Sequence, residues 1–195
     1  MEDLFELKIP IFWNEGKPEI DFKNYKLSIV GLVKRALDFS LLQLEKRAKD
    51  SVSARLTSVT RWSVRLNWEG ILCKSLLNEV KPLKNARFVK FVSYGRKYFT
   101  VVPIDAMYHE RAIIALAANN AKLPVEYGGP VRVVFPQLWG YKSAKSIVEI
   151  SFQERYEKGY WESRGYDDSA EILPTKVYDI NAGKTKFNEG GEVLW

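Results

Sequence analysis

Residues 127–145 read YGGPVRVVFPQLWGYKSAK, an apolar run with a glycine-containing turn at each end. The run at residues 131–136 is β-branched and ends in Pro136, which predicts a short strand. The first turn, residues 127–130, contains two adjacent glycines, which allow a ligand to approach the backbone closely. Arg132 follows, and a guanidinium can bind phosphate through two hydrogen bonds. A Gly-Gly-Pro sequence by itself is more often only a turn.

The second turn, residues 140–145, places several phosphate-binding groups close together. It contains the cations of Lys142 and Lys145, the hydroxyl of Ser143 and free backbone N–H groups. Such a set suits a pyrophosphate or a phosphomonoester. It is not a P-loop, because the G-x-x-x-x-G-K-[ST] spacing is absent from the sequence. The alternative is the beginning of a strand that carries solvated lysines.

Outward from this stretch, hydrophobic periodicity predicts strands and short helices. Strands are expected at residues 25–33, 52–59, 88–92, 98–102 and 145–152, with 93–97 as a hairpin turn. Helices are expected at 41–49 after the cap Ser40, at 71–80, and at 107–119 after the cap Asp105. These elements alternate without a regular βαβ rhythm. The pattern favours an α+β fold with mixed β-sheets over a doubly wound sheet.

The length of 195 residues, of which 46% are hydrophobic, predicts one domain with a sizeable core. Within it, residues 1–24 are expected to form an extended arm and residues 167–195 a surface tail. No apolar segment resembles a signal peptide or is long enough to span a bilayer, so we expect a cytoplasmic protein. One Cys and two Met beside many Lys and Glu hint at a thermophile.

Charge and metal-binding residue types limit the classes of function. The formal net charge of +6 suits an anionic partner, but the 30 basic and 24 acidic residues are interspersed. No basic helix or RNA-binding motif is present, so a nucleic-acid-binding module ranks last. The single Cys73 and the single His109 exclude an intrachain disulfide and a Cys-rich or His-rich metal site. Ser58 has no neighbouring His or Asp, which argues against a hydrolase triad.

In combination, the motifs resemble the molybdopterin-binding domain of the sulfite oxidase family. The resemblance runs from about residue 9 to about residue 166, and the order and spacing of the motifs make it specific. The matching segments are 10–18, 25–33, 40–44, 58–63, 68–70, 127–132, 140–145 and the aromatic stretch 159–166.

The resemblance implies a fold, a cofactor and a reaction. It implies a molybdenum held by the two sulfurs of one pterin dithiolene, by oxo groups and by one protein thiolate. The reaction would be oxygen-atom transfer on sulfite, a sulfoxide or a similar small substrate, with two-electron changes at the metal. No haem or iron–sulfur spacing is present, so electrons would pass to a separate partner protein or a diffusible carrier.

The family's cofactor-binding positions can be carried over residue by residue. Ser93 falls where the family has a hydroxyl residue in contact with the cofactor. The resemblance assigns the pterin and its phosphate to residues of the two turns. These residues are Tyr127, Arg132, Lys142, Ser143, Ala144 and Lys145.

Three family positions carry different residues in this chain, namely Thr57, Ser58 and Tyr127. Small members of the family read His-Cys-Val-Thr where residues 57–60 read Thr-Ser-Val-Thr, so Ser58 falls at the metal-ligand position. They read His-Gly-Gly-Pro where residues 127–130 of this chain read Tyr-Gly-Gly-Pro. A serine hydroxyl is a poorer ligand than a thiolate, although serinate ligates molybdenum in other molybdoenzyme classes. Two functions therefore stay open: an oxygen-atom-transfer enzyme, or a catalytically inactive relative that keeps the fold for binding or assembly.

Overall fold

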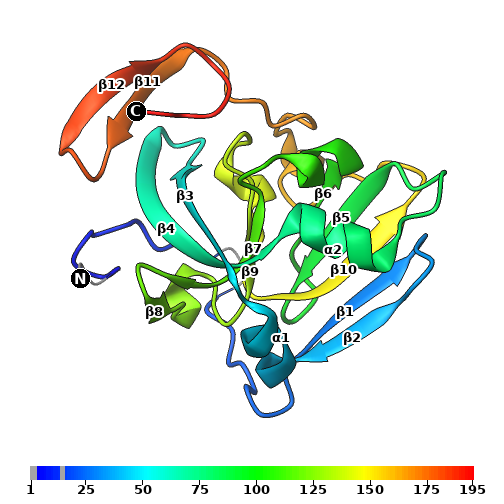
Figure 1. The fold of residues 1–195 in the computed structure, drawn as a ribbon. Coiled ribbons are helices and arrows are strands. Elements are labelled where there is room, and N and C mark those ends of the chain that lie inside the picture. Colours follow the sequence, from blue (N-terminus) through cyan, green and yellow to red (C-terminus); the bar gives the residue numbers. More distant parts are fainter. Residues whose placement is uncertain (1–3, 14–15) are drawn as a thin grey trace.

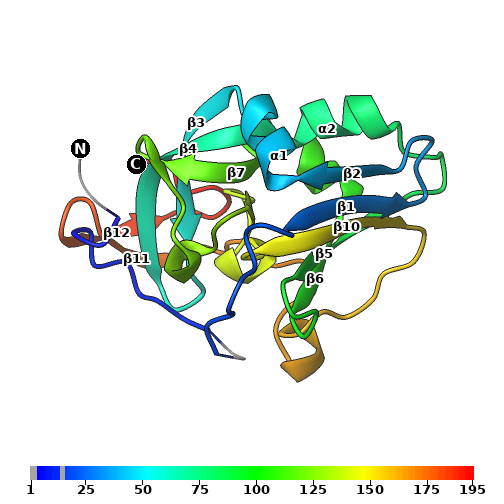
Figure 2. The same cartoon turned by 90° about the horizontal axis from the view of Figure 1, so that it is seen from below.

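The computed structural model describes residues 4–13 and 16–195 (Figure 1). It contains two mixed β-sheets and two short α-helices, α1 (Leu41–Arg47) and α2 (Cys73–Val80), which lie on the same side of the molecule (Figure 2). The expected α+β architecture is confirmed. Within the described residues 4–13 and 16–24, the arm forms neither helix nor strand. The remaining arm residues, 1–3 and 14–15, lie outside the described ranges.

The first sheet has the strand order β2-β1-β10-β5-β6. Its β1 pairs in parallel with β10, and the other neighbours are antiparallel. The hairpin of β5 and β6 confirms the turn expected at residues 93–97. The strands are β1 (Lys26–Gly31), β2 (Leu37–Ser40), β5 (Phe88–Ser93), β6 (Phe99–Pro103) and β10 (Ile147–Gln153).

The second sheet has the order β12-β11-β4-β7-β8, and β3 and β9 pair with β4 and β7. The strands are β3 (Asp50–Thr57), β4 (Trp62–Leu72), β7 (Ile113–Ala118), β8 (Ala121–Lys122), β9 (Arg132–Val134), β11 (Thr175–Asp179) and β12 (Lys184–Asn188). Four 3₁₀ turns connect strands: η1 (Ile104–Tyr108), η2 (Val125–Tyr127), η3 (Gly140–Lys142) and η4 (Glu162–Arg164).

Strand β9 lies between the two hydrophobic cores. Val133 belongs to the core of the first sheet and Val134 to the core of the second. Consecutive side chains of a strand point to opposite faces, so a strand buried on both faces reads as a continuous apolar run. This position explains why residues 131–135 are mostly apolar. It also places the turns at the two ends of the run between the two sheets.

A local cap sets the start of α1, and strand pairing sets the start of α2. Ser40 caps α1, with a capping box to Gln43, as the sequence predicts. The helix expected at 71–80 begins at Cys73, because Ile71 and Leu72 pair with β7 as the end of β4. No helix in the described ranges is long and apolar enough to cross a membrane.

The helix predicted at residues 107–119 is wrong. Asp105 lies in the short turn η1, and residues 113–118 form β7, which pairs with β4, β8 and β9. Ile113, Ile114 and Ala115 are fully or almost fully buried. Alanine favours helix locally, but a short apolar run fits a strand buried on both faces equally well, and here tertiary pairing decides.

The surface tail expected at residues 167–195 also needs correction. Residues 175–188 contain the β11–β12 hairpin, whose β11 pairs in parallel with β4. The buried carboxylate of Asp179 accepts hydrogen bonds from Arg55 and Lys186 and so anchors the hairpin to β3. The polar composition of this region hid the hairpin, because its partners lie more than a hundred positions earlier in the chain.

Candidate functional site

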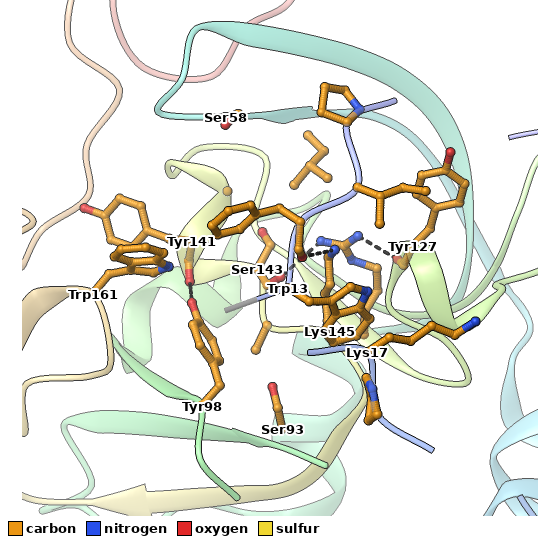
Figure 3. Close-up of a pocket in the computed structure, with 18 of the residues that line it drawn as sticks. Trp13, Lys17, Ser58, Ser93, Tyr98, Tyr127, Tyr141, Ser143, Lys145 and Trp161 are labelled. Atoms are coloured by element: carbon orange, nitrogen blue, oxygen red, sulfur yellow. Dashed lines mark hydrogen bonds between the residues drawn. The ribbon is translucent and has the colours of Figure 1, made fainter. Parts of the chain in front are cut away.

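A cavity of about 580 Å³ opens between the two sheets (Figure 3). The amino-terminal arm forms one wall, and the turns at 58–60 and 93–98 contribute further parts of the lining. Both glycine-containing turns also reach it, the first through Tyr127 and Arg132 and the second through Gly140, Tyr141 and residues 143–145. Segments far apart in the sequence therefore meet in one pocket.

Arg132 ties the two turns together. Its Nη1 donates to the backbone oxygen of Tyr127 at 2.8 Å, and its Nη2 donates to that of Ser143 at 3.0 Å. The side chain is buried, its Nε has no hydrogen-bond partner, and no carboxylate of the described chain pairs with it. Burial lowers the pKa of Arg132 to about 10, so the group stays a cation at neutral pH.

Lys145 is a second basic group whose partners are carbonyl groups. Its Nζ donates to the backbone oxygens of Phe12 at 2.9 Å and Glu126 at 3.2 Å, and it lies 4.6 Å from the ring centroid of Trp13. Burial, with repulsion from Arg132 added, lowers the pKa of Lys145 to about 7. A buried positive charge without a counter-charge is unfavourable, so this end of the pocket favours an anion.

The two glycines of the first turn serve packing within the chain. A Cβ at Gly128, whose φ is +98°, would lie 2.9 Å from Cγ of Lys145. A Cβ at Gly129 would lie 1.9 Å from the backbone oxygen of Leu123. The close approach expected here for a ligand is thus made by the protein itself, and it sets the stem of Lys145 beside Arg132.

Further polar groups at the pocket lack partners among the described residues. Ser93 Oγ and Trp13 Nε1 are buried in the lining without a hydrogen bond. Buried polar atoms are almost always paired in folded proteins, so orphaned ones that line a cavity point to a ligand. Ser143 differs, since its Oγ accepts the backbone N–H of Phe135 at 3.0 Å. Ala144 lines the pocket beside it.

Lys142 does not line the pocket. Its side chain is fully buried, and its Nζ donates to the backbone oxygen of Val101 at 2.8 Å and pairs with the carboxylate of Glu162. Burial lowers the pKa of Lys142, and Glu162 opposes that shift. The structure therefore separates Lys142 from Arg132 and Lys145, with which the sequence grouped it.

Ser58 lies in the turn between β3 and β4 and lines the pocket. Its Oγ is 2.8 Å from Oγ1 of Thr60 and accepts the backbone N–H of Thr60 at 3.2 Å. Figure 3 shows Ser58 apart from Lys17 and Lys145, on another side of the cavity. Among the described residues, no cluster of three His, Cys, Asp or Glu side chains forms a ready-made metal site.

An aromatic wall, defined as Phe12, Tyr141, Trp161 and Tyr166, completes the lining. Phe12 stacks on Trp161 at 6.1 Å between ring centroids, and Trp161 lies 4.7 Å from Tyr166. Tyr166 meets Tyr141 edge-on at 5.2 Å. The aromatic stretch 159–166 was recognisable in the sequence. The contribution of the arm was not, because nothing local places Phe12 or Trp13 beside residues that follow more than a hundred positions later.

Comparisons with known proteins give a consistent result. The family described as "Oxidoreductase molybdopterin binding domain" matches residues 14–161. The chain is 29% identical over 157 residues to the protein-methionine-sulfoxide reductase catalytic subunit MsrP of Campylobacter jejuni, which covers 72% of this chain and 53% of that protein. It is 30% identical over 152 residues to MsrP of Ralstonia nicotianae, which covers 70% and 46%.

Another relative is the putative protein-methionine-sulfoxide reductase subunit YedZ1 of Azospira oryzae, 28% identical over 149 residues, covering 76% of this chain and 56% of that protein. The chain thus spans about half the length of the curated relatives it matches. In fold, it is similar to the sulfane dehydrogenase SoxCD from Paracoccus pantotrophus, with a TM-score of 0.67 at 17% identity, covering 90% of this chain and 47% of that chain.

Proposed function

The chain belongs to the oxidoreductase molybdopterin-binding domain family, and from that membership we propose that its pocket binds molybdopterin with molybdenum for oxygen-atom transfer. The observation that carries the proposal is the pair of cations at one end of the pocket. Arg132 and Lys145 are held by backbone carbonyls, and no carboxylate of the described chain neutralises them. The phosphate of the cofactor would supply the negative charge that this environment favours.

The remaining polar groups of the lining suit the rest of the cofactor. Ser93 Oγ and Trp13 Nε1 have unused hydrogen-bonding capacity, as a polar pterin requires. Ser58, which the family resemblance puts at the cysteine position, would stand at the metal as an oxygen ligand when its hydroxyl loses its proton. Once bound, the molybdenum cofactor supplies the two-electron chemistry of oxygen-atom transfer, while the protein binds, orients and excludes water.

For the substrate, we propose a neutral organic sulfoxide. The aromatic wall lines the pocket with apolar surface. Lys17 and Lys97, which also line it, already have interaction partners, and Arg132 and Lys145 are assigned to the phosphate. An inorganic oxyanion would lack a dedicated cation. Two relatives are named protein-methionine-sulfoxide reductase catalytic subunits, which supports the same class.

The proposed reaction consumes two electrons and two protons. It removes the sulfoxide oxygen as water and leaves a thioether. The electrons would come from a separate donor, either a protein or a diffusible carrier. The Azospira relative is named as a subunit, which supports a reductase made of more than one chain.

Cofactor content tests the binding step. The protein would be purified from a host that makes molybdopterin, and molybdenum and released pterin would be measured per chain. We expect near-stoichiometric amounts in the unaltered protein and large losses in Arg132→Met and Lys145→Met. Arg47→Met is the matched control, because Arg47 forms a surface ion pair with Glu79 away from the pocket. A well-folded protein without pterin or metal would instead support the catalytically inactive relative.

Turnover tests the substrate class. With the loaded protein and a reduced dye as electron donor, we expect conversion of methionine sulfoxide to methionine. Sulfite, assayed in the oxidising direction with an electron-accepting dye, should give no turnover. The reverse preference would reject the neutral substrate while leaving the cofactor assignment intact.

A further inference from the structure

We propose that Lys142 and Glu162 form a positioning clamp that holds Trp161 and Tyr166 of the aromatic wall against the second turn. The inference rests on the proposed function only in taking this pocket as the ligand site. It gives Lys142 a different role from the phosphate contact that the family resemblance implies.

The clamp is an ion pair removed from solvent. Lys142 is 0% exposed and Glu162 is 1% exposed. Lys142 Nζ pairs with Glu162 Oε1, and the same oxygen accepts a hydrogen bond from Thr100 Oγ1 at 2.8 Å. Lys142 Nζ also donates to the backbone oxygen of Val101. Because Thr100 and Val101 belong to β6, both partners of the clamp are fastened to one strand of the first sheet.

The neighbours of the clamp residues in the chain line the pocket. Tyr141 and Ser143 flank Lys142, and Trp161 precedes Glu162. The pair therefore joins the turn whose Ser143 carbonyl holds Arg132 to the segment 159–166, which carries Trp161 and Tyr166 of the aromatic wall. Movement of either clamp residue would shift lining groups of the pocket at once.

Packing around Glu162 limits alternative arrangements. A Cβ at Gly159 would lie 2.6 Å from Glu162 Oε2 and 2.7 Å from the backbone oxygen of Phe99. The backbone N–H of Tyr160 donates to that same Phe99 oxygen at 2.9 Å. The segment 159–166 thus begins directly against β6, and only glycine at position 159 permits this approach.

Stability alone does not account for such a pair. Replacing both partners of a buried ion pair by apolar residues of similar size is often neutral or stabilising, whereas removal of one partner leaves an uncompensated charge. The pair lies between two pocket-lining segments, and holding these segments in a fixed arrangement is a role that two apolar side chains would not fill. This difference separates a positioning role from a purely stabilising one.

The test uses the double variant Lys142→Met/Glu162→Met without cofactor, so that it does not depend on the proposed reaction. Lys158 and Arg164 are exposed trypsin sites on either side of Trp161 and Glu162. We expect an unchanged melting temperature but cleavage after these two residues that is at least tenfold faster than in the unaltered protein. Equal cleavage rates at equal melting temperature would overturn the proposal.

A matched control replaces another buried ion pair, in Arg55→Met/Asp179→Leu. That pair lies between β3 and β11 and is as buried as the clamp. Its loss should speed cleavage at Lys184 in the β11–β12 hairpin but leave cleavage at Lys158 and Arg164 unchanged. Faster cleavage at Lys158 in this control would mean general loosening and would also count against the clamp.

If the double variant does not fold, Lys142→Gln/Glu162→Gln serves instead, since the amide at position 162 can still accept from Thr100 and no charge is left buried without a partner. The same local increase in cleavage is expected. In cofactor-loaded protein, clamp variants should raise KM for the sulfoxide several-fold more than they lower kcat, because the wall contacts substrate rather than the reacting atoms. A fall in kcat as large as the rise in KM would reject a positioning role for the clamp.

Discussion

Lys145 Nζ donates to the backbone oxygen of Phe12 at 2.9 Å and so joins the second turn to the amino-terminal arm across 133 positions of sequence. The bond places a cation of the proposed phosphate site in direct contact with the wall that covers it. A change in the charge of Lys145 would therefore affect both the arm and the phosphate end of the pocket.

The first prediction concerns pH and Lys145. Burial lowers the pKa of Lys145 to about 7 in the ligand-free protein, against about 10.4 in an unfolded chain. Between these values the unfolded state binds a proton that the folded state lacks, so raising the pH through this window stabilises the folded state. The melting temperature of the unaltered protein, relative to that of Lys145→Met, should rise from pH 7 to pH 9.5. A constant difference would contradict the burial of this charge.

The second prediction concerns Ser58 at the proposed metal position. Ser58→Cys replaces a hydroxyl with a softer and more strongly donating thiolate, which should raise molybdenum retention and change the visible absorption of the loaded protein. Metal analysis and absorption spectroscopy measure both effects. Thr60→Val is the control for the loss of the Ser58–Thr60 hydrogen bond. Identical metal content and spectrum in Ser58→Cys would remove Ser58 from the metal site.

The third prediction concerns the single cysteine. Cys73 is fully buried at the start of α2, and burial raises the pKa of its thiol far above the usual range. A thiol in this state neither ligates a metal nor reacts with thiol reagents. Cys73→Ala should leave cofactor content unchanged and reduce the free energy of unfolding by about 1 kcal/mol. Modification of Cys73 in the native protein by a thiol reagent would refute this assignment.

The fourth prediction concerns Gly159. Gly159→Ala introduces a methyl group into the contact with Glu162 and the backbone of β6, where no flexible group can withdraw without moving the strand. Overpacking of this kind costs about 1–3 kcal/mol of unfolding free energy. Chemical denaturation measures the cost, with Gly165→Ala as a control. Gly165 has open space around its Cβ position, and its φ of +94° makes some strain expected there too. A loss at Gly159 below about 1 kcal/mol would mean that crowding is absent.

Local patterns predicted the elements whose signals are local. The cap Ser40 and the capping box to Gln43 lie three residues apart, and the hairpin at 93–97 needs only its own turn. The arm residues Phe12 and Trp13 and the hairpin of β11 and β12 could not be placed in this way, because their contacts join distant parts of the chain. Residues 113–118 were misread because an alanine-rich apolar run suits a helix and a buried strand alike.

The sequence by itself determined the family resemblance and the two glycine-containing turns, and it predicted Arg132, Lys142 and Lys145 as the cations of an anion site. Each of these depends on residue type and spacing within a short segment. Only the tertiary structure decided which cations share the pocket. Lys142 and Lys145 are three positions apart, yet Lys142 turns into the core because Glu162 lies there, and Lys145 stays at the cavity because its partners are carbonyls. The partner of a charge is set by folding, since the free energy of a buried ion depends on groups brought to it from elsewhere in the chain.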